Sequence, residues 1–438
     1  MNKSVAFYTL GCKLNFSETS TIANEFAQNG FKLNRFNQNS DVYVVNTCTV
    51  TENAEKDCRQ IVRRALRTNP NAYIIVTGCY AQLRAEEIAK IEGVDAVLGS
   101  NEKFKIFDLI NSFEKEELSC IYVKENSFNE FNSAFSTDAD DRTRAYFKIQ
   151  DGCDYKCTFC TIPLARGKSR SIEMDLAVEQ FENLIKSGYK EIILTGVNVG
   201  DYGKKNNSNL YELLKRFVKI PGDFRMRISS IEPNLLTNEI IELTADNPKL
   251  CNHFHIPLQS GSDKILKLMQ RRYKTTDYRN VIENAVKKVK DVGIGVDVII
   301  GSPGETEEDF MATYNFIKEL PVSYLHVFTY SERPDTKALF IDGKVDAAEK
   351  KRRSSMLRIL SEKLKNNFYR SMIGKEVKVL FEENNKDSFI YGFSSNYIKI
   401  KYPFNSDLAN TFKIVNIKDV NDNICQIKNL NQNYKITL

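Results

Sequence analysis

Three closely spaced cysteines form the first group of residues that could do chemistry. Cys153, Cys157 and Cys160 make a C-x3-C-x2-C run directly after a predicted strand over Ala145–Ile149. Thiolates this close along one loop can wrap one face of an iron–sulfur cube, because each iron prefers a soft sulfur ligand. Three cysteines leave one iron open to chelate a small molecule through amino and carboxylate groups. Such chelation is needed to pass an electron into the sulfonium of S-adenosylmethionine.

Two other interpretations of this loop are a zinc knot without its fourth ligand and a set of reduced, buried cysteines. Zinc sites usually supply C-x2-C pairs and four protein ligands. Buried structural cysteines have no reason to gather in a loop that also carries Asp151, Asp154 and Lys156. The loop follows a strand, and the carboxyl ends of strands carry the chemistry of βα barrels. These points favour the iron–sulfur cluster.

A second group consists of Cys12, Cys48 and Cys79, which are far apart in the sequence but each follow a predicted strand. In a parallel sheet, the loops after neighbouring strands emerge at the same edge, so we expect these thiols to converge. The alternative is that each is an ordinary buried cysteine, which behaves as a small hydrophobic residue. Their shared position beside glycine or threonine favours a second metal site. The remaining four show no partner spacing: Cys58, Cys120, Cys251 and Cys425.

The elements before the first cysteine loop predict an open parallel α/β sheet. Short apolar runs alternate with helical stretches, as expected of βαβ units. The helix over Ser17–Gln28 is followed by Gly30, which suits a C-terminal cap. A polar, acidic stretch over 126–142 then predicts a linker. The expected strands are Val5–Leu10, Val42–Thr47, Tyr73–Thr77 and Val94–Leu98.

The middle of the chain predicts a partial (β/α)6 barrel, because six strand candidates alternate with helices. These strands are Ala145–Ile149, Glu191–Thr195, Phe224–Ser229, His253–Leu258, Gly295–Ile300 and Tyr324–Tyr330. His326 lies within an apolar strand and is expected to be a core residue rather than a ligand. A charged helix over Ala347–Tyr369 precedes short strands that predict a small all-β domain. The predicted boundaries are 1–125, 126–142, 143–371 and 372–438.

Composition limits the class of protein. The chain has 438 residues, of which 42% are hydrophobic and 27% charged. No apolar run approaches the roughly 18 residues of a membrane span, and Met1–Asn15 offers no signal-peptide core. We therefore expect a cytoplasmic protein without a membrane partner. The net charge of +5, from 62 basic and 57 acidic residues, permits an anionic partner but does not identify nucleic acid.

The cysteine motifs and their flanks resemble one enzyme family. The segment 145–171, together with the three upstream cysteines, is similar to the radical S-adenosylmethionine methylthiotransferases. The resemblance covers nearly the whole chain and implies an N-terminal methylthiotransferase domain, a partial barrel and a C-terminal TRAM-type RNA-binding domain. Thr9–Asn15, Gln150–Cys153 and Ala165–Arg170 look most like the branch that modifies N6-threonylcarbamoyladenosine at tRNA position 37.

This resemblance implies a reaction and its cofactors. Cys153, Cys157 and Cys160 would hold the [4Fe–4S] cluster that cleaves S-adenosylmethionine to a 5′-deoxyadenosyl radical. The second group of cysteines would hold an auxiliary [4Fe–4S] cluster that carries sulfur to C2 of the modified adenine, and a second S-adenosylmethionine would supply the methyl group. The implied partners are the tRNA anticodon stem-loop, a flavodoxin- or ferredoxin-like electron donor, and a sulfur donor.

The resemblance also implies residues around the cofactor, although glycine turns and helix-start carboxylates are common without a ligand. The basic residues Arg166, Lys168 and Arg170 are candidates for tRNA phosphate or the threonylcarbamoyl carboxylate, unless they are solvated surface charge. Candidates for S-adenosylmethionine are Phe159, Thr195, Gly196, Asn198, Ser230, Glu232, Gln259 and Gly301. Candidates for RNA in the β domain are Lys375, Lys378, Lys399, Lys401, Tyr391, Phe393 and Tyr397, although the aromatic residues suit a core equally well.

Two residues depart from the family pattern, and three other functions stay open. Asp335 stands where the family usually has glycine, and Ser302 replaces a common aromatic residue. These departures concern local loop shape. The open alternatives are a radical enzyme acting on another tRNA adenosine, one acting on a ribosomal-protein side chain, and a non-enzymatic RNA-binding protein with structural zinc.

Overall fold

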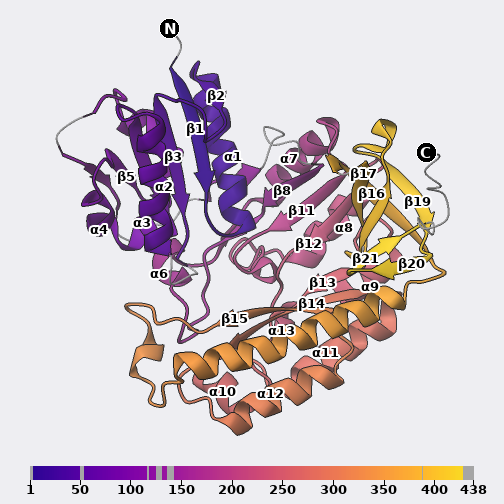
Figure 1. Cartoon of the computed structure of the whole chain (residues 1–438). Helices are drawn as coiled ribbons and strands as arrows, with labels where there is room; N and C mark the ends of the chain where they lie inside the picture. Colours follow the sequence, from indigo (N-terminus) through magenta and orange to yellow (C-terminus); the bar gives the residue numbers. More distant parts are fainter. Residues whose placement is uncertain are drawn as a thin grey trace, which may run out of the picture.

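The structure is a computed structural model that describes residues 3–49, 54–115, 118–124, 131–135, 143–386 and 388–427. An N-terminal sheet stands on one side of a set of central strands, and a C-terminal strand-rich domain stands on the other side (Figure 1). Of the helices that the structure describes, none combines the length and the apolar character that crossing a bilayer requires.

The N-terminal sheet is parallel and has the strand order β2-β1-β3-β4-β5-β6. Its central strands are buried along their whole length, because helices cover both faces. The four predicted strands are confirmed, and two short outer strands were missed. The strands are β1 (Ser4–Thr9), β2 (Lys32–Asn34), β3 (Val42–Thr47), β4 (Tyr73–Gly78), β5 (Ala96–Leu98) and β6 (Cys120–Tyr122).

The helices of this domain include one that begins earlier than its sequence pattern indicates. Helix α1 starts at Lys13 rather than at the predicted Ser17, because its buried face carries polar side chains that hide the apolar periodicity. Asn15 and Glu18 are both fully buried on that face. The helices are α1 (Lys13–Gln28), α2 (Ala54–Thr68), α3 (Cys79–Leu83), α4 (Ala85–Ala89) and α5 (Ile106–Leu109).

Six parallel strands form the centre of the molecule, as predicted from the alternating pattern. They pair as β8-β11-β12 and as β13-β14-β15, and single parallel bridges such as Ser230–His255 link the two sets. The strands are β8 (Arg144–Lys148), β11 (Glu191–Thr195), β12 (Arg225–Ile228), β13 (His253–His255), β14 (Gly293–Ile300) and β15 (Tyr324–Thr329). The helices packed on them are α7 (Met174–Lys186), α8 (Leu210–Lys219), α9 (Asn238–Asp246), α10 (Asp263–Leu268), α11 (Thr275–Lys288), α12 (Glu307–Glu319) and α13 (Ala347–Arg370).

The segment predicted as a linker is not entirely irregular. Residues Ala134 and Phe135 form strand β7, which pairs antiparallel with β8 and extends the central sheet. Ala134 is fully buried, and the strand also packs on α1. Of the predicted linker, 126–130 and 136–142 lie outside the described residues. A single buried alanine and one phenylalanine were too short a pattern to predict a strand.

The C-terminal domain is a sheet with the order β19-β16-β17-β18-β21-β20. One predicted strand over Tyr391–Ile400 is in fact two strands, because the chain turns between them at Tyr397, whose φ is 71°. The strands are β16 (Glu376–Lys386), β17 (Phe389–Ser394), β18 (Lys399–Pro403), β19 (Phe412–Asn416), β20 (Asp419–Asn421) and β21 (Ile424–Gln426).

Two arginines of β12 attach this domain to the central strands. Arg225 donates a hydrogen bond of 2.9 Å to the carbonyl oxygen of Phe393, and Arg227 donates one of 2.9 Å to that of Ser395. The Tyr397 ring packs against His253 at 5.0 Å between centroids and against Phe393 at 5.1 Å. Phe393 and Tyr397 therefore belong to the domain interface, which corrects their assignment as RNA-stacking candidates.

Candidate iron–sulfur and cofactor site

The three upstream cysteines meet at the edge of the N-terminal sheet where the strand order reverses. Cys12 follows β1 and Cys48 follows β3, and ligands of open α/β sheets bind at such a switch between neighbouring strands. Gly11 shows how closely the loops approach, since a Cβ atom there would lie 2.6 Å from the Cys48 Sγ atom. The expected convergence of these loops is confirmed.

Gly78 places the third cysteine of this group. Its φ is 99°, and a Cβ atom there would lie 2.3 Å from the carbonyl oxygen of Thr47. Only glycine fits this position without displacing the neighbouring strand. Cys79 therefore begins α3 directly beside the loop that carries Cys48.

The other three cysteines lie in the loop between β9 (Gln150–Asp151) and α6 (Ile162–Arg166). The loop is closed by a hydrogen bond of 3.0 Å from the Cys153 amide to the Gly167 carbonyl oxygen. Burial raises the pKa of Cys153 and Cys160 to about 12, so the free thiols keep their protons at neutral pH. A bound metal cation reverses this preference by stabilising thiolates. The buried loop is therefore suited to a metal centre rather than to a free reactive thiol.

The two cysteine loops touch each other across the domain junction. Thr49 directly follows Cys48 and Thr161 directly follows Cys160, and their hydroxyl oxygens lie 3.1 Å apart. The Ser100 hydroxyl also donates a hydrogen bond of 3.0 Å to the carbonyl oxygen of Ala165, which lies in α6 directly after the downstream cysteine loop. Metal centres held by the two groups would thus face a common space.

Arg166 is buried at this junction and contacts both domains. Its guanidinium donates to the Cys79 Sγ atom at 3.2 Å, to Asn15 Oδ1 at 2.7 Å and to Glu18 Oε1 at 2.8 Å. Arg170 is also buried, and it contacts Asp151 Oδ2 at 2.9 Å. Because both side chains are buried on protein partners, these contacts argue against Arg166 and Arg170 as ligands for tRNA phosphate or for the threonylcarbamoyl carboxylate. Lys168 is exposed and stays a candidate for either anion.

Around Arg166 lies a network of buried charges that the sequence analysis missed. The Glu18 carboxylate contacts the ammonium groups of Lys103 at 2.5 Å and Lys148 at 2.9 Å. Burial acts to raise the pKa of Glu18, but the charges of Arg166, Lys103 and Lys148 outweigh it and hold the pKa well below its ordinary value. Lys148, within the strand predicted over Ala145–Ile149, was the signal that could have revealed this network.

The balance of charge in this network favours an anionic centre beside it. Among the described residues of this network, the three cations Lys103, Lys148 and Arg166 pair with two carboxylates, which belong to Glu18 and Asp151. Uncompensated buried charge is costly. Thiolates at Cys12, Cys48 and Cys79 would balance the surplus, because the Arg166 guanidinium already contacts one of these sulfur atoms.

The carboxyl ends of the central strands carry buried polar atoms without a protein partner among the described residues. Three of the predicted cofactor residues have such atoms: Thr195 Oγ1, both side-chain atoms of Asn198, and Gln259 Oε1. The Ser229 and Ser302 hydroxyls share this property. Buried polar groups are normally hydrogen-bonded, so these atoms fit a polar ligand such as S-adenosylmethionine.

Other predicted cofactor residues have different surroundings. A Cβ atom on Gly196 would lie 2.8 Å from Gln150 Oε1, and one on Gly301 would lie 2.5 Å from the Lys350 side chain, so both glycines make room for protein. Glu232 forms an ion pair with Arg271, whose guanidinium also donates to Cys157 Sγ at 3.1 Å. Glu232 therefore orients a cation at the cysteine loop rather than standing as a solvated carboxylate.

Two more predicted cofactor residues lie at the edges of this region. Phe159 is partly buried and packs beside Ser302 and Tyr330 at the far side of the cysteine loop. Ser230 is bridged to His255 through its backbone.

A cavity of about 980 Å³ opens beside the cysteine loop, and its lining includes Cys153, Tyr155, Lys156, Lys168, Arg170 and Lys205. Lysines at such a cavity are suited to an anionic partner.

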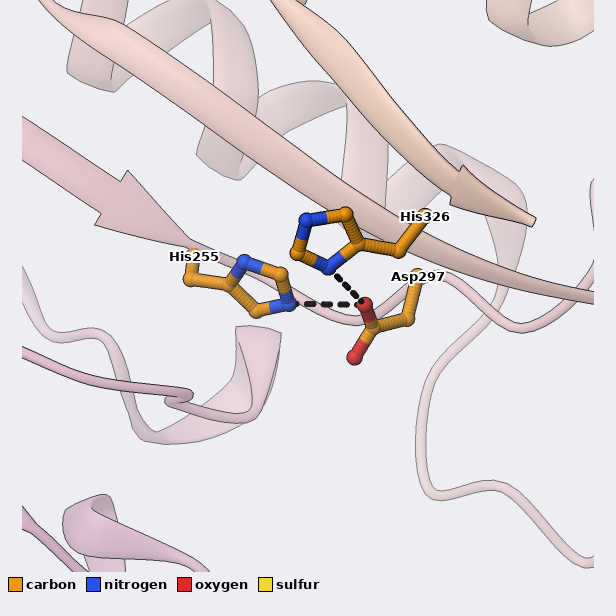
Figure 2. Close-up of side chains that lie close together, drawn as sticks. All are labelled: His255, Asp297 and His326. Carbon is orange, nitrogen blue, oxygen red and sulfur yellow. Dashed lines mark hydrogen bonds and ion pairs between the residues drawn. The ribbon is translucent and has the colours of Figure 1, made fainter. Parts of the chain in front are cut away.

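The inner wall of β13, β14 and β15 carries a pair of imidazoles around one carboxylate (Figure 2). His255 Nε2 lies 2.8 Å and His326 Nδ1 lies 3.2 Å from the same Oδ1 atom of Asp297. The His326 side chain is 52% exposed, so its assignment as a core residue is wrong. Alternation along β15 turns this side chain away from the helices and toward the interior space.

Asp335 takes the backbone conformation that glycine adopts easily. Its φ is 65°, and its carboxylate contacts Arg84 Nη2 at 2.8 Å. Aspartate is among the residues that tolerate this left-handed region. The departure from the family pattern therefore preserves the loop and adds an ion pair to the N-terminal domain.

Comparisons with family models match both cysteine-bearing regions. The Radical SAM superfamily matches residues 147–317, and the Uncharacterized protein family UPF0004 matches residues 4–99. Among solved structures, a radical S-adenosylmethionine methyltransferase, TsrM, from Kitasatospora setae has a TM-score of 0.56 over 77% of each chain, at 15% identity. That likeness supports the radical-SAM α/β fold.

Curated relatives extend the likeness over almost the whole chain. The threonylcarbamoyladenosine tRNA methylthiotransferase MtaB of Bacillus subtilis is 40% identical, covering 95% of this chain and 93% of the relative. MtaB of Aquifex aeolicus is 39% identical, covering 91% of this chain and 96% of the relative. The tRNA-2-methylthio-N(6)-dimethylallyladenosine synthase of Fusobacterium nucleatum is 34% identical, covering 95% of this chain and 97% of the relative. The chain therefore belongs to the radical S-adenosylmethionine methylthiotransferase family.

Proposed function

We propose that this chain methylthiolates C2 of N6-threonylcarbamoyladenosine at tRNA position 37. The observation that carries the proposal is the meeting of two cysteine groups across one domain junction, with Thr49 and Thr161 in contact. Radical formation and sulfur delivery at one carbon atom require both centres within reach of the same base. The named activity of the MtaB relatives supports the choice of substrate.

The domain assignments follow from this function. The six central strands and their helices are assigned to a partial (β/α)6 barrel, and the C-terminal sheet to a TRAM-type RNA-binding domain. The domain boundaries at 1–125, 126–142, 143–371 and 372–438 belong to this proposal. The cytoplasmic location and the need for an electron donor and a sulfur donor follow from the same activity.

Each cofactor has candidate residues. Cys153, Cys157 and Cys160 would hold one [4Fe–4S] cluster, and Cys12, Cys48 and Cys79 would hold the other. When bound, the two clusters and S-adenosylmethionine supply an adenosyl radical, sulfur and a methyl group. The unpartnered atoms of Thr195, Asn198 and Gln259 bind and orient the cofactor at the ends of the strands. Arg271 holds the cysteine loop through Cys157.

The RNA would bind over two lysine-bearing surfaces. Lys156, Lys168 and Lys205 line the cavity beside the cysteine loop. On the C-terminal sheet, the Lys401 ammonium lies 3.7 Å from the centre of the Phe389 ring, and Lys399 lies 4.8 Å from that of Tyr391. Alternating lysines and aromatic rings suit phosphate contacts and base stacking.

Iron analysis and nucleoside analysis test the proposal. Anaerobic reconstitution should yield about eight iron atoms per chain, as expected for two four-iron clusters. Deleting the gene should remove 2-methylthio-N6-threonylcarbamoyladenosine from tRNA, and restoring it should return the nucleoside. Loss of 2-methylthio-N6-dimethylallyladenosine instead would assign the activity of the Fusobacterium relative. Unchanged tRNA with a modified ribosomal protein, or zinc without 5′-deoxyadenosine formation, would reject the proposal.

A further inference from the structure

Lys13 stands out because it is a cation without a visible counter-charge beside the upstream cysteines. It is the first residue of α1 and directly follows Cys12. Its side chain keeps free surface, although α1 packs against β7 and β8. The described residues provide it with no hydrogen bond within 3.5 Å and no ion pair within 4.0 Å. Lys13 therefore faces a space that the protein leaves open.

The charged groups that act on the Lys13 ammonium lie on the inner wall of the central strands. They are Arg227, Arg144, Glu191 and Asp297. Lys13 thus directly follows one of the upstream cysteines, on a helix packed against β8, and lies within electrostatic range of that wall. The same wall holds the two imidazoles that face Asp297 (Figure 2).

The carboxylates of this wall are committed to other partners. Glu191 is fully buried and contacts Arg225 at 2.5 Å and Arg227 at 3.0 Å. Asp297 accepts from both imidazoles through one oxygen. Neither carboxylate lies within ion-pair distance of Lys13, so the positive charge of Lys13 has no direct partner on the described part of the wall.

The two arginines of the wall are also held in place. Arg144 contacts Glu382 at 2.6 Å, and Arg227 donates to the Ser395 carbonyl oxygen at 2.9 Å. Both arginines are therefore held by protein groups, whereas the described residues give Lys13 no such partner, so the Lys13 side chain can move toward a ligand. An ammonium in a partly desolvated space gains most from an anion that reaches it directly.

We propose that Lys13 binds the carboxylate of the threonylcarbamoyl group and thereby selects this substrate over adenosines with an apolar N6 group. The proposal rests on the proposed function. The N6 substituent projects from the purine edge that also carries N1 and C2. A cation next to Cys12, on the sulfur-delivering side, would reach this substituent when C2 is positioned for reaction. Lys13 is thus a specificity-determining residue.

A substrate with one altered group tests this assignment. Two anticodon stem-loop RNAs are compared, one with the natural carboxylate and one with the side chain as its primary amide. For Lys13→Met we expect kcat/KM to fall about 10- to 100-fold on the carboxylate RNA, the range for a charged hydrogen bond. On the amide RNA the change should stay below about 3-fold. Lys13→Arg should restore most of the activity on the carboxylate RNA.

The controls separate binding from damage to the metal centres. Iron content and 5′-deoxyadenosine formation without RNA should match the wild-type enzyme in Lys13→Met. Lys186→Met serves as the matched lysine control, because Lys186 is 73% exposed and far along the surface helix α7. This control should leave both RNAs unaffected. The wild-type enzyme itself should prefer the carboxylate RNA, a comparison that needs no variant.

Four results would overturn the assignment. Equal rates of the wild-type enzyme on both RNAs would show that the carboxylate is not recognised. Equal losses of Lys13→Met on both RNAs would indicate a structural role. A rise in KM for S-adenosylmethionine alone would place the carboxylate of that cofactor at Lys13. A wild-type enzyme that forms 5′-deoxyadenosine but methylthiolates neither RNA would reject the proposed function as well.

Discussion

Neutralising Glu18 tests the charge network at the domain junction most directly. Glu18→Gln keeps the shape of the side chain but removes the anion that faces Lys103, Lys148 and Arg166. The side chains of Glu18 and Lys103 have no exposed surface, so solvent does not replace the lost charge. Removing one partner from a buried ion pair costs about 3–5 kcal/mol.

This loss should appear as a large shift in chemical unfolding. With a urea dependence of about 2 kcal/mol/M, the midpoint falls by about 2 M. Circular dichroism is the suitable probe, because the chain has no tryptophan. The matched control is Glu182→Gln, whose partner Lys186 lies 3.8 Å away at the surface. Exposed ion pairs contribute less than about 1 kcal/mol to stability, so the urea midpoint of the control variant should change little.

The stability that the Glu18 carboxylate contributes changes with pH in a direction that its pKa predicts. Neighbouring cations hold the pKa of Glu18 well below its ordinary value despite burial. A lowered pKa in the folded state stabilises the protein above the unfolded value, about 4.3, and this stabilisation is lost as pH falls toward the folded value. The difference in the free energy of unfolding between wild type and Glu18→Gln should therefore stay constant from about pH 8 to about pH 5. Below about pH 5 this difference should shrink. Equal midpoints for Glu18→Gln and Glu182→Gln at pH 7 would refute the reasoning.

Three other changes have distinct expected outcomes. Cys157→Ser should lose about four iron atoms and all 5′-deoxyadenosine formation, whereas Cys79→Ser should lose similar iron but keep that formation; iron assays and chromatography check both. Gly78→Ala should cost about 1–3 kcal/mol in urea unfolding, since its φ is 99° and the Thr47 carbonyl blocks a Cβ atom; an unchanged midpoint would contradict this. Arg225→Met should speed proteolysis of the C-terminal domain, because the bond to the Phe393 carbonyl is lost; unchanged cleavage would argue against that anchor.

Features that depend on short stretches of chain could be predicted without the fold. Cys153, Cys157 and Cys160 lie within one loop, so covalent geometry alone keeps their sulfur atoms near each other. Apolar runs identified β3 and β11 with their observed bounds, because buried strands of a parallel sheet are apolar on both faces. The convergence of Cys12 and Cys48 followed from one added rule, that parallel strands end at a common edge.

The burial of each charged side chain, and the groups that it faces, could not be predicted in this way. Arg166, Lys168 and Arg170 look alike in the sequence, yet Arg166 is enclosed by Glu18 and Cys79 while Lys168 is exposed. Likewise, the isolation of Lys13 depends on how Glu191 and Asp297 are partnered. The groups around a charged side chain come from segments that are far apart in the sequence. The spacing of residues along the chain therefore does not reveal which groups surround it.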